Sequence, residues 1–141
     1  MGTDIRPEIS KDSKYYILKH RYYELKHFVQ QYPDWIKELR EIDSMTKRPV
    51  DYIASSDISD PVFRAVERRE ELQRRIKIIT DASNKTDKII GIYILNAVIN
   101  NESYERINAR SPIPCCREVY YELYRKFFWL LDQSRDSHTP L

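Results

Sequence analysis

The stretch that decides the fold is residues 103–131, SYERINARSPIPCCREVYYELYRKFFWLL. Its start predicts a short helix capped by Ser103, with Ile107 on the inner side. The segment Ser111-Pro112-Ile113-Pro114 predicts a tight, non-helical turn that carries an inward apolar residue. A longer helix then follows to Leu131. On it we expect a buried face made of Val119, Leu123, Phe127 and either Leu130 or Leu131.

The composition of the whole chain agrees with a helical protein. The chain has 141 residues, of which 41% are hydrophobic and 33% are charged. This length fits one domain, or one small domain with an appendage. With 2 glycines the chain has few residues suited to the positive-φ turns of hairpin-rich β proteins, and no stretch alternates apolar and polar residues for long. The sequence predicts an all-α fold.

The residues just before this stretch predict one more helix in the same C-terminal unit, which we bound at 86–133. Thr86 or Asp87 can cap it, and Asn100-Asn101 suits its end. Between them, residues 89–99 are apolar on nearly every side. A helix that is hydrophobic all round is buried, so we expect this one at the centre of the unit.

Residues 12–44 predict an antiparallel helical hairpin at the N-terminal end. Asp12 or Ser13 can cap its first helix, and Pro33 suits the first turn of the second. The first helix carries an apolar stripe of Tyr15, Leu18, Tyr22, Leu25 and Val29, and the second carries Trp35, Ile36, Leu39 and Ile42. The tyrosines and Trp35 pack internally or form a surface for a partner.

Between these parts, residues 45–59 predict an exposed connector and residues 60–85 a long charged amphipathic helix. Ser59-Asp60-Pro61 is a helix start with a proline at the first helical position. The helix has an apolar seam of Val62, Ala65, Leu72, Ile76 and Ile79, interrupted by Arg69. The seam packs against the N-terminal hairpin, or it joins two copies of the chain. We expect flexible tails at 1–11 and 134–141.

A short helix, a brief turn and a longer helix are the layout of a DNA-binding helix-turn-helix. The longer helix, starting near Pro114, would enter the major groove. Its base-contacting candidates are Cys116, Arg117, Tyr120 and Tyr121. Arg117 is the strongest, because a guanidinium can make a bidentate contact to guanine O6 and N7. The phosphate-contacting candidates are Ser103, Tyr104, Arg106, Arg110, Ser111, Arg125 and Lys126.

The charge pattern also allows a different interpretation. The net charge is only +2, so any DNA contact must come from local charge placement. Glu118 and Glu122 on the last helix would repel phosphates. Two amphipathic helices joined by a proline-containing turn also occur in bundles that never touch DNA. The alternative is therefore a helical adaptor or inhibitor that binds a protein partner.

A resemblance favours DNA binding. Residues 101–131 resemble the C-terminal end of the RinA-type and ArpU-type phage transcriptional regulators, particularly in Ser103-Tyr104, in Ile113-Pro114-Cys115 and in residues 124–128, YRKFF. The resemblance implies a helix-turn-helix similar to region 4 of sigma factors. It further implies regulation of phage or prophage late genes, in contact with host RNA polymerase. Glu118 and Glu122 depart from the family, whose last helix tends to be basic.

Other classes of function find no support in the sequence. With Gly2 and Gly91 alone, no glycine-rich phosphate loop exists, and no catalytic arrangement can be assembled, so we expect no enzyme, cofactor or small-molecule substrate. His20, His27, His138 and the adjacent Cys115 and Cys116 lack the spacing of a metal site, and we expect reduced thiols. No signal peptide or membrane span is evident. The predicted location is the cytoplasm of a bacterial host, at the nucleoid, with double-stranded DNA as partner and a homodimer as one form.

Overall fold

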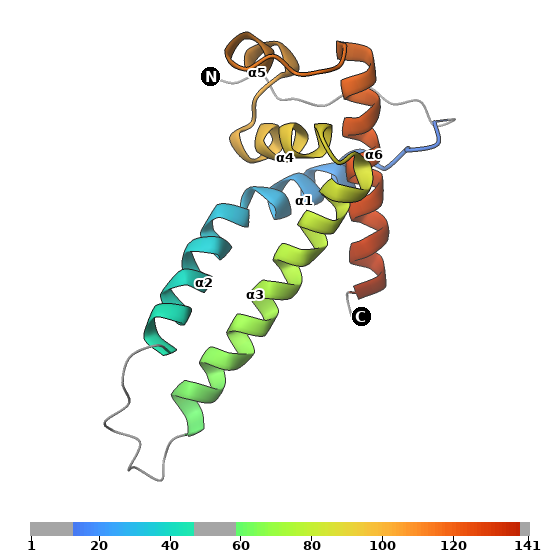
Figure 1. The fold of residues 1–141 in the computed structure, drawn as a ribbon. Coiled ribbons are helices and arrows are strands. Elements are labelled where there is room, and N and C mark those ends of the chain that lie inside the picture. The colour runs from blue at the N-terminus through green and yellow to red at the C-terminus, as the bar shows by residue number, and fades with distance from the viewer. Residues whose placement is uncertain (1–12, 47–58, 139–141) are drawn as a thin grey trace. The chain divides into compact units, whose positions relative to one another are not determined.

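The computed structural model of the chain describes residues 13–46 and 59–138 (Figure 1). Within these ranges it contains helices and no strand, so the predicted all-α class is confirmed. The helices are α1 (Lys19–Gln30), α2 (Tyr32–Thr46), α3 (Ser59–Thr86), α4 (Ile90–Asn100), α5 (Tyr104–Arg110) and α6 (Arg117–His138). The expected tail at 1–11 and most of the expected connector at 45–59 lie outside the described residues.

The chain divides into two compact units. Unit 1 comprises Met1–Gln31 and Ile78–Leu141, and unit 2 comprises Tyr32–Lys77. In unit 1, α1, α4 and α6 pack against one another. Tyr22 of α1 meets α6 twice: its ring lies edge-on to Phe128 with centroids 4.8 Å apart, and its hydroxyl lies 3.1 Å from the Tyr124 hydroxyl. The core of unit 1 is therefore partly aromatic and contains a buried hydrogen bond.

The first helix is shorter than the sequence predicted. It begins at Lys19, and residues 13–16 form a turn in which the Tyr16 amide donates to the Ser13 carbonyl at 3.2 Å. The Ser13 hydroxyl accepts from the Tyr15 amide, so this serine stabilises a turn and does not cap a helix. The Tyr15 ring lies 5.7 Å from Trp129. The predicted helix cap at Ser13 was wrong, because the side chains of residues 13–16 have partners in a non-helical segment, and the alternative cap Asp12 lies outside the described residues.

In unit 2, α2 lies antiparallel to the first part of α3. Arg68 donates to Glu38 at 2.7 Å, and Arg69 donates to Asp43 at the same distance. The Arg75 guanidinium covers the ring of Trp35, which is buried. Arg69, which interrupts the predicted apolar seam of α3, thus pairs with Asp43 of α2. The predicted hairpin of the first two helices is not confirmed, because α1 packs within unit 1 while the partner of α2 in its own unit is α3.

The apolar seam of α3 is only partly buried. Leu72 and Ile79 are buried, but Val62 is 50% exposed, and its neighbours Phe63 and Val66 are exposed as well. The described residues therefore leave the first turns of the seam uncovered. Both interpretations of this helix, internal packing and dimerisation, remain predictions for those turns.

Both ends of α4 lie at residues that the sequence offered for them, although of the two capping candidates only Asp87 is used, because Thr86 ends α3 and its hydroxyl donates to the Ala82 carbonyl. The carboxylate of Asp87 accepts from the amides of Ile89 and Ile90, both at 2.8 Å, and caps the helix. Donation by these amides lowers the pKa of Asp87. At the other end Asn101 adopts a left-handed conformation with φ of 52°, and the Glu102 amide donates to the Ala97 carbonyl. This arrangement closes the helix in the way a C-terminal asparagine allows.

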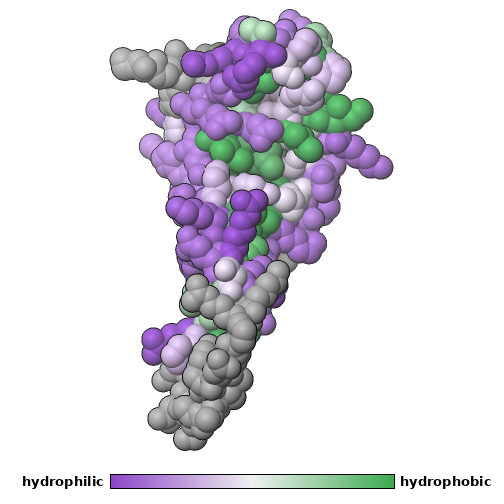
Figure 2. All heavy atoms as spheres, turned by 60° about the vertical axis from the view of Figure 1, so that its left-hand side comes forward, coloured by the Kyte–Doolittle hydropathy of each residue, from purple (hydrophilic) through white to green (hydrophobic). Residues whose placement is uncertain are grey.

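The predicted all-round burial of α4 was wrong. Ile94, Ala97 and Val98 are buried, whereas Ile89 and Ile92 are 64% and 59% exposed. Figure 2 shows hydrophobic surface at the level where Figure 1 labels α4. One face of α4 contacts α1 and α6. Because residues 89–99 are apolar on nearly every side, the apolar residues on the opposite face stay exposed.

The last helix is longer than predicted. It extends to His138, so residues 134–138 are helical and the tail predicted from 134 was wrong there. Arg135 lies over the Phe28 ring at 4.0 Å, and Arg21 donates to Asp132 at 2.5 Å. Both contacts join the end of α6 to α1, which explains why the helix continues past the predicted boundary.

Candidate nucleic-acid interface

The short helix α5 begins as predicted. The Ser103 hydroxyl accepts from the Arg106 amide at 3.2 Å, which satisfies one of the free amides at the helix start. Ile107 is buried beneath the helix. The hydroxyl oxygen of Ser103 is therefore used as an acceptor in capping. Its O–H can still donate to the phosphate that the sequence predicted it to contact. Ser111, the last of the expected phosphate contacts on this side, ends α5 and is exposed.

The turn between α5 and α6 is two residues longer than predicted. Ile113 is buried, and its amide donates to the Asn108 side chain at 2.8 Å. The carbonyl of Cys115 accepts from the Tyr104 hydroxyl at 2.7 Å. Because these bonds hold the backbone in a non-helical path, α6 begins at Arg117 and not near Pro114. Residues 111–116 thus form the turn, and Arg117 becomes the first residue of the longer helix.

The buried face of α6 agrees with the predicted one at Phe127 and Leu131 and differs from it at the other positions. Val119 is 48% exposed, and Leu123 and Leu130 are half-buried. The buried positions are Tyr120, Tyr124, Phe127, Phe128 and Leu131. Two sets of residues on this helix have helical spacing, one beginning at Val119 and one at Tyr120. The set that begins at Tyr120 is buried because its Tyr124 and Phe128 contact Tyr22 of α1.

Because the buried face of α6 is not wholly the predicted one, one of the base-contacting candidates lies inside the protein. Tyr120 has no exposed surface, and its ring packs against those of Tyr104 and Tyr121. Its hydroxyl is buried and has no hydrogen-bond partner among the described residues. The prediction that Tyr120 faces outward was wrong, and a residue so placed cannot contact DNA while α6 stays packed.

Two other tyrosines of the predicted site join α5 to α6. The Tyr121 hydroxyl accepts from the Tyr104 amide at 3.1 Å, while the Tyr104 hydroxyl donates to the Cys115 carbonyl. Both side chains are half-buried. Their oxygens therefore serve the turn between the helices, and each leaves only part of its ring edge to solvent.

Cys116 is exposed and Cys115 half-buried, both as free thiols. Partial burial raises the pKa of the Cys115 thiol, so the protonated form is favoured. Cys116, a predicted base-contacting residue, is thus the one of the pair whose side chain is open to solvent.

Arg106 and Arg110 share a single carboxylate. Arg110 makes two parallel hydrogen bonds of 2.9 Å to Glu102, and the Arg106 Nε atom lies 3.6 Å from the same group. The Glu102 side chain is 14% exposed, and the hydrogen bond from Arg110 lowers the pKa of its carboxyl. Both guanidinium groups are exposed on the outer side of α5.

Arg117 is held across the turn. Its Nε donates to Glu105 of α5 at 2.6 Å, and its guanidinium lies 5.0 Å from the Tyr121 ring centroid. The side chain is nevertheless 62% exposed. Farther along α6, Arg125 pairs with Glu122 at 3.4 Å, and Lys126 is half-buried. The expected phosphate contacts of this helix are thus less open to solvent than those of α5.

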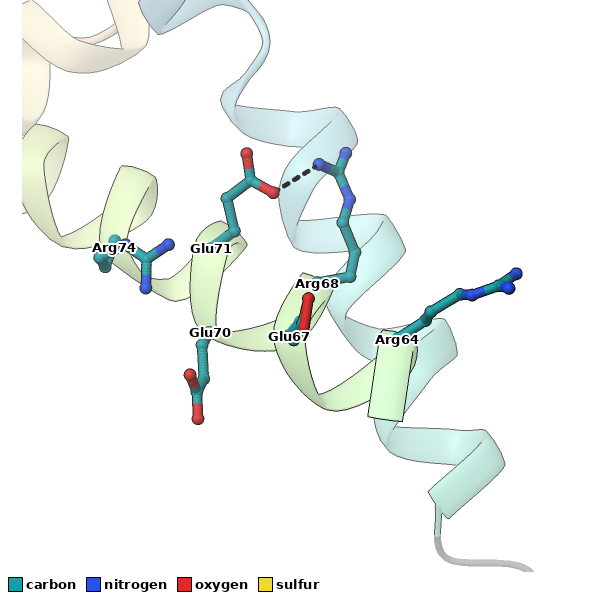
Figure 3. A pocket seen from close by; sticks show the side chains of 6 residues that line it. All are labelled: Arg64, Glu67, Arg68, Glu70, Glu71 and Arg74. Carbon is teal, nitrogen blue, oxygen red and sulfur yellow. Dashed lines mark hydrogen bonds and ion pairs between the residues drawn. The ribbon is translucent and has the colours of Figure 1, made fainter. Parts of the chain in front are cut away.

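A second polar region lies on α3, in unit 2. Arg64, Glu67, Arg68, Glu70, Glu71 and Arg74 line a shallow depression (Figure 3). Their side chains point in different directions, and the ion pair drawn between them joins Arg68 to Glu71. Three positive and three negative groups that do not converge offer no selective ligand site, and they belong to the charged face of the helix predicted at residues 60–85.

The described residues contain neither a candidate metal-binding cluster nor a candidate membrane-spanning helix. They contain no group of three or more histidine, cysteine, aspartate or glutamate side chains arranged to hold a metal ion. Among the described helices none has the length and apolar character that crossing a bilayer requires.

No protein-family model, no curated protein and no solved structure matches this chain.

Proposed function

We propose that this protein binds double-stranded DNA and regulates transcription, with α5 against the phosphate backbone and the start of α6 in the major groove. The observation that carries the proposal is the placement of three exposed arginines, Arg106 and Arg110 on α5 and Arg117 at the first position of α6. In DNA-binding helix-turn-helix units, the N-terminal side chains of the second helix contact bases, and the first helix crosses the backbone.

The glutamates beside these arginines affect the site to different degrees. The Arg117–Glu105 pair joins two exposed side chains and is worth about 0–1 kcal/mol, whereas the two-bond Arg110–Glu102 pair, whose carboxylate is mostly buried, is stronger and costs more to break. An arginine–phosphate contact also releases counterions from DNA, which favours binding at low salt. Arg106 and Arg117, the two most exposed of these arginines, can therefore contact DNA although each has a carboxylate partner in the free protein.

The cellular role follows from the resemblance to the RinA-type and ArpU-type regulators. On this resemblance, the proposed role is that of a regulator of phage or prophage late genes, which acts at the bacterial nucleoid and contacts host RNA polymerase. The turn of residues 111–116, with Ile113 buried, supports the helix-turn-helix layout on which this proposal rests. A homodimer would bind two half-sites about one helical turn apart.

The test is DNA binding measured against salt concentration. A duplex selected from a randomised library is titrated with the wild-type protein between low and moderate salt. Replacing Arg117 by Ala should cost about 1–3 kcal/mol of site-specific affinity, and replacing Arg106 and Arg110 by Ala should lower the salt slope by about one unit per lost phosphate contact. Arg64→Ala in unit 2 is a matched control that should leave both quantities unchanged. Salt-independent binding, or no binding even at low salt, would contradict the proposal.

A protein-binding adaptor is the second candidate. It is favoured by one observation, the pairing of Arg106, Arg110, Arg117 and Arg125 with glutamates, which reduces the positive potential of the surface. The same experiment discriminates between the two functions, since an adaptor that binds protein shows no steep salt-dependent affinity for DNA.

A further inference from the structure

The hydrogen bond between Glu105 and Arg117 fixes the direction of a side chain that would otherwise be free. Arginine has several rotatable bonds, and an exposed one loses considerable conformational entropy when a ligand immobilises it. Here the Arg117 Nε donates to the Glu105 Oε2 at 2.6 Å, over a sequence separation of 12 residues. The contact links the first turn of α5 to the first residue of α6.

The bond leaves the other donors of the guanidinium available. Arginine has five N–H donors, of which one is on Nε and four are on the two Nη atoms. Glu105 engages the Nε donor, so the Nη edge stays free to make two parallel hydrogen bonds. Guanine offers a matching pair of acceptors, O6 and N7, in the major groove.

A second contact restricts the guanidinium from the side. Its carbon lies 5.0 Å from the centroid of the Tyr121 ring, a distance suited to a cation–π interaction. The Tyr121 ring is itself held, because its hydroxyl accepts from the Tyr104 amide. Arg117 thus lies between a carboxylate of α5 and a fixed aromatic ring of α6.

We infer that Glu105 is a positioning residue that orients Arg117 toward a guanine and so sets the base preference of the site. This inference rests on the proposed function. An ion pair between two exposed side chains contributes little to folding stability, which separates an orienting role from a purely structural one. Glu105 itself contacts no DNA in this arrangement.

The experiment compares variants by selection of bound sequences from a duplex library with a randomised centre. The wild type should enrich guanine at one position, and Arg117→Ala should abolish that enrichment. Glu105→Ala should reduce the preference at the same position by about tenfold and leave the other positions unchanged. Glu105→Gln should retain most of the preference, because its amide oxygen still accepts from Nε.

Glu118→Ala is the matched control. Glu118 is an exposed carboxylate in the first turn of α6, so its removal changes the charge of the same surface equally. It should raise overall DNA affinity slightly and leave the guanine preference intact. A Glu105→Ala profile that keeps the guanine, or that changes in the same way as that of Glu118→Ala, would overturn the inference. A Glu105→Gln profile as flat as that of Glu105→Ala would also overturn it.

A readout without DNA tests the contact itself. In a nitrogen-15 NMR spectrum the Arg117 Nε–H should exchange slowly with water in the wild type and rapidly in Glu105→Ala. Equal exchange in both proteins would show that the side chain is not held and would overturn the inference. If the wild type selects no sequence and binds no duplex, both the inference and the proposed function fail, whereas selection without an effect of Glu105 refutes the inference alone.

Discussion

Gly91 of α4 lies directly against Ser83 near the end of α3, so that a Cβ atom at position 91 would stand 2.2 Å from the Ser83 carbonyl oxygen and 2.9 Å from its hydroxyl. Atoms of this kind do not approach so closely without a shift of the backbone. The contact sets how near the start of α4 can lie to the end of α3 within unit 1. Only glycine, whose side chain is a single hydrogen atom, allows the two helices to approach this closely.

The first prediction is that Gly91→Ala destabilises the protein. Alanine is the better helix former by about 1 kcal/mol, but the clash with backbone atoms of Ser83 outweighs this gain. We expect a net loss of about 3 kcal/mol and a melting temperature lower by about 10 °C, measured by circular dichroism. Asn96→Ala, at an exposed position of the same helix, is the control and should change little. A Gly91→Ala protein as stable as the wild type would refute the close approach.

A second prediction concerns the left-handed residue that ends α4. Asn101 has φ of 52°, a conformation that costs most residues with a Cβ atom about 1–2 kcal/mol. Asn101→Ala should therefore lose about 1 kcal/mol of unfolding free energy, while Asn101→Gly should match or exceed the wild type. Urea unfolding measures both. Asn100→Ala, at the neighbouring helical position, is the control. A destabilised glycine variant would contradict the assigned conformation.

The third prediction distinguishes two buried tyrosines on α6. The Tyr120 hydroxyl is buried without a hydrogen-bond partner among the described residues, whereas the Tyr124 hydroxyl pairs with that of Tyr22. Tyr120→Phe should be neutral or stabilising by about 1 kcal/mol, because it removes an unsatisfied group, while Tyr124→Phe should cost about 1 kcal/mol. Thermal unfolding of the two variants gives the comparison. The reverse order would mean that Tyr120 has a partner in solution.

The fourth prediction is a pH dependence that comes from the cap of α4. The Ile90 and Ile89 amides lower the pKa of Asp87 in the folded protein, with Lys126 adding a smaller effect. A carboxyl with a lowered folded pKa contributes stability that is complete above its unfolded pKa and is lost as pH falls through the folded pKa. Asp87→Asn keeps a capping oxygen but does not titrate. Its unfolding free energy should therefore approach or exceed that of the wild type as pH falls from about 5 to about 2.

Arg110 likewise lowers the pKa of the Glu102 carboxyl, but this group is present in both proteins and cancels in the difference. A difference in unfolding free energy that stays constant over this pH range would contradict the cap.

The sequence by itself determined the local features of the C-terminal unit. Ser103 and Asp87 cap their helices, Asn101 ends α4, and Ile107 and Ile113 are buried, all as predicted. The capping contacts join residues no more than three positions apart, and the helical repeat offers Ile107 for burial on the inner side of α5. Hydrogen bonds of that reach and the helical repeat are fixed by chain geometry, so the order of residues alone encodes them.

The tertiary structure alone decided which faces are buried and which charges meet. On α6 two stripes have helical spacing, and Tyr120 is buried while Val119 is exposed because the Tyr124 and Phe128 rings of the same stripe meet Tyr22, about a hundred positions away in the chain. The pairing of Arg117 with Glu105 likewise requires the turn at 111–116 to bring two helices together. Helical periodicity fixes the candidates for a face, but contact with a distant partner selects one of them, since burial is gained only where another surface is present.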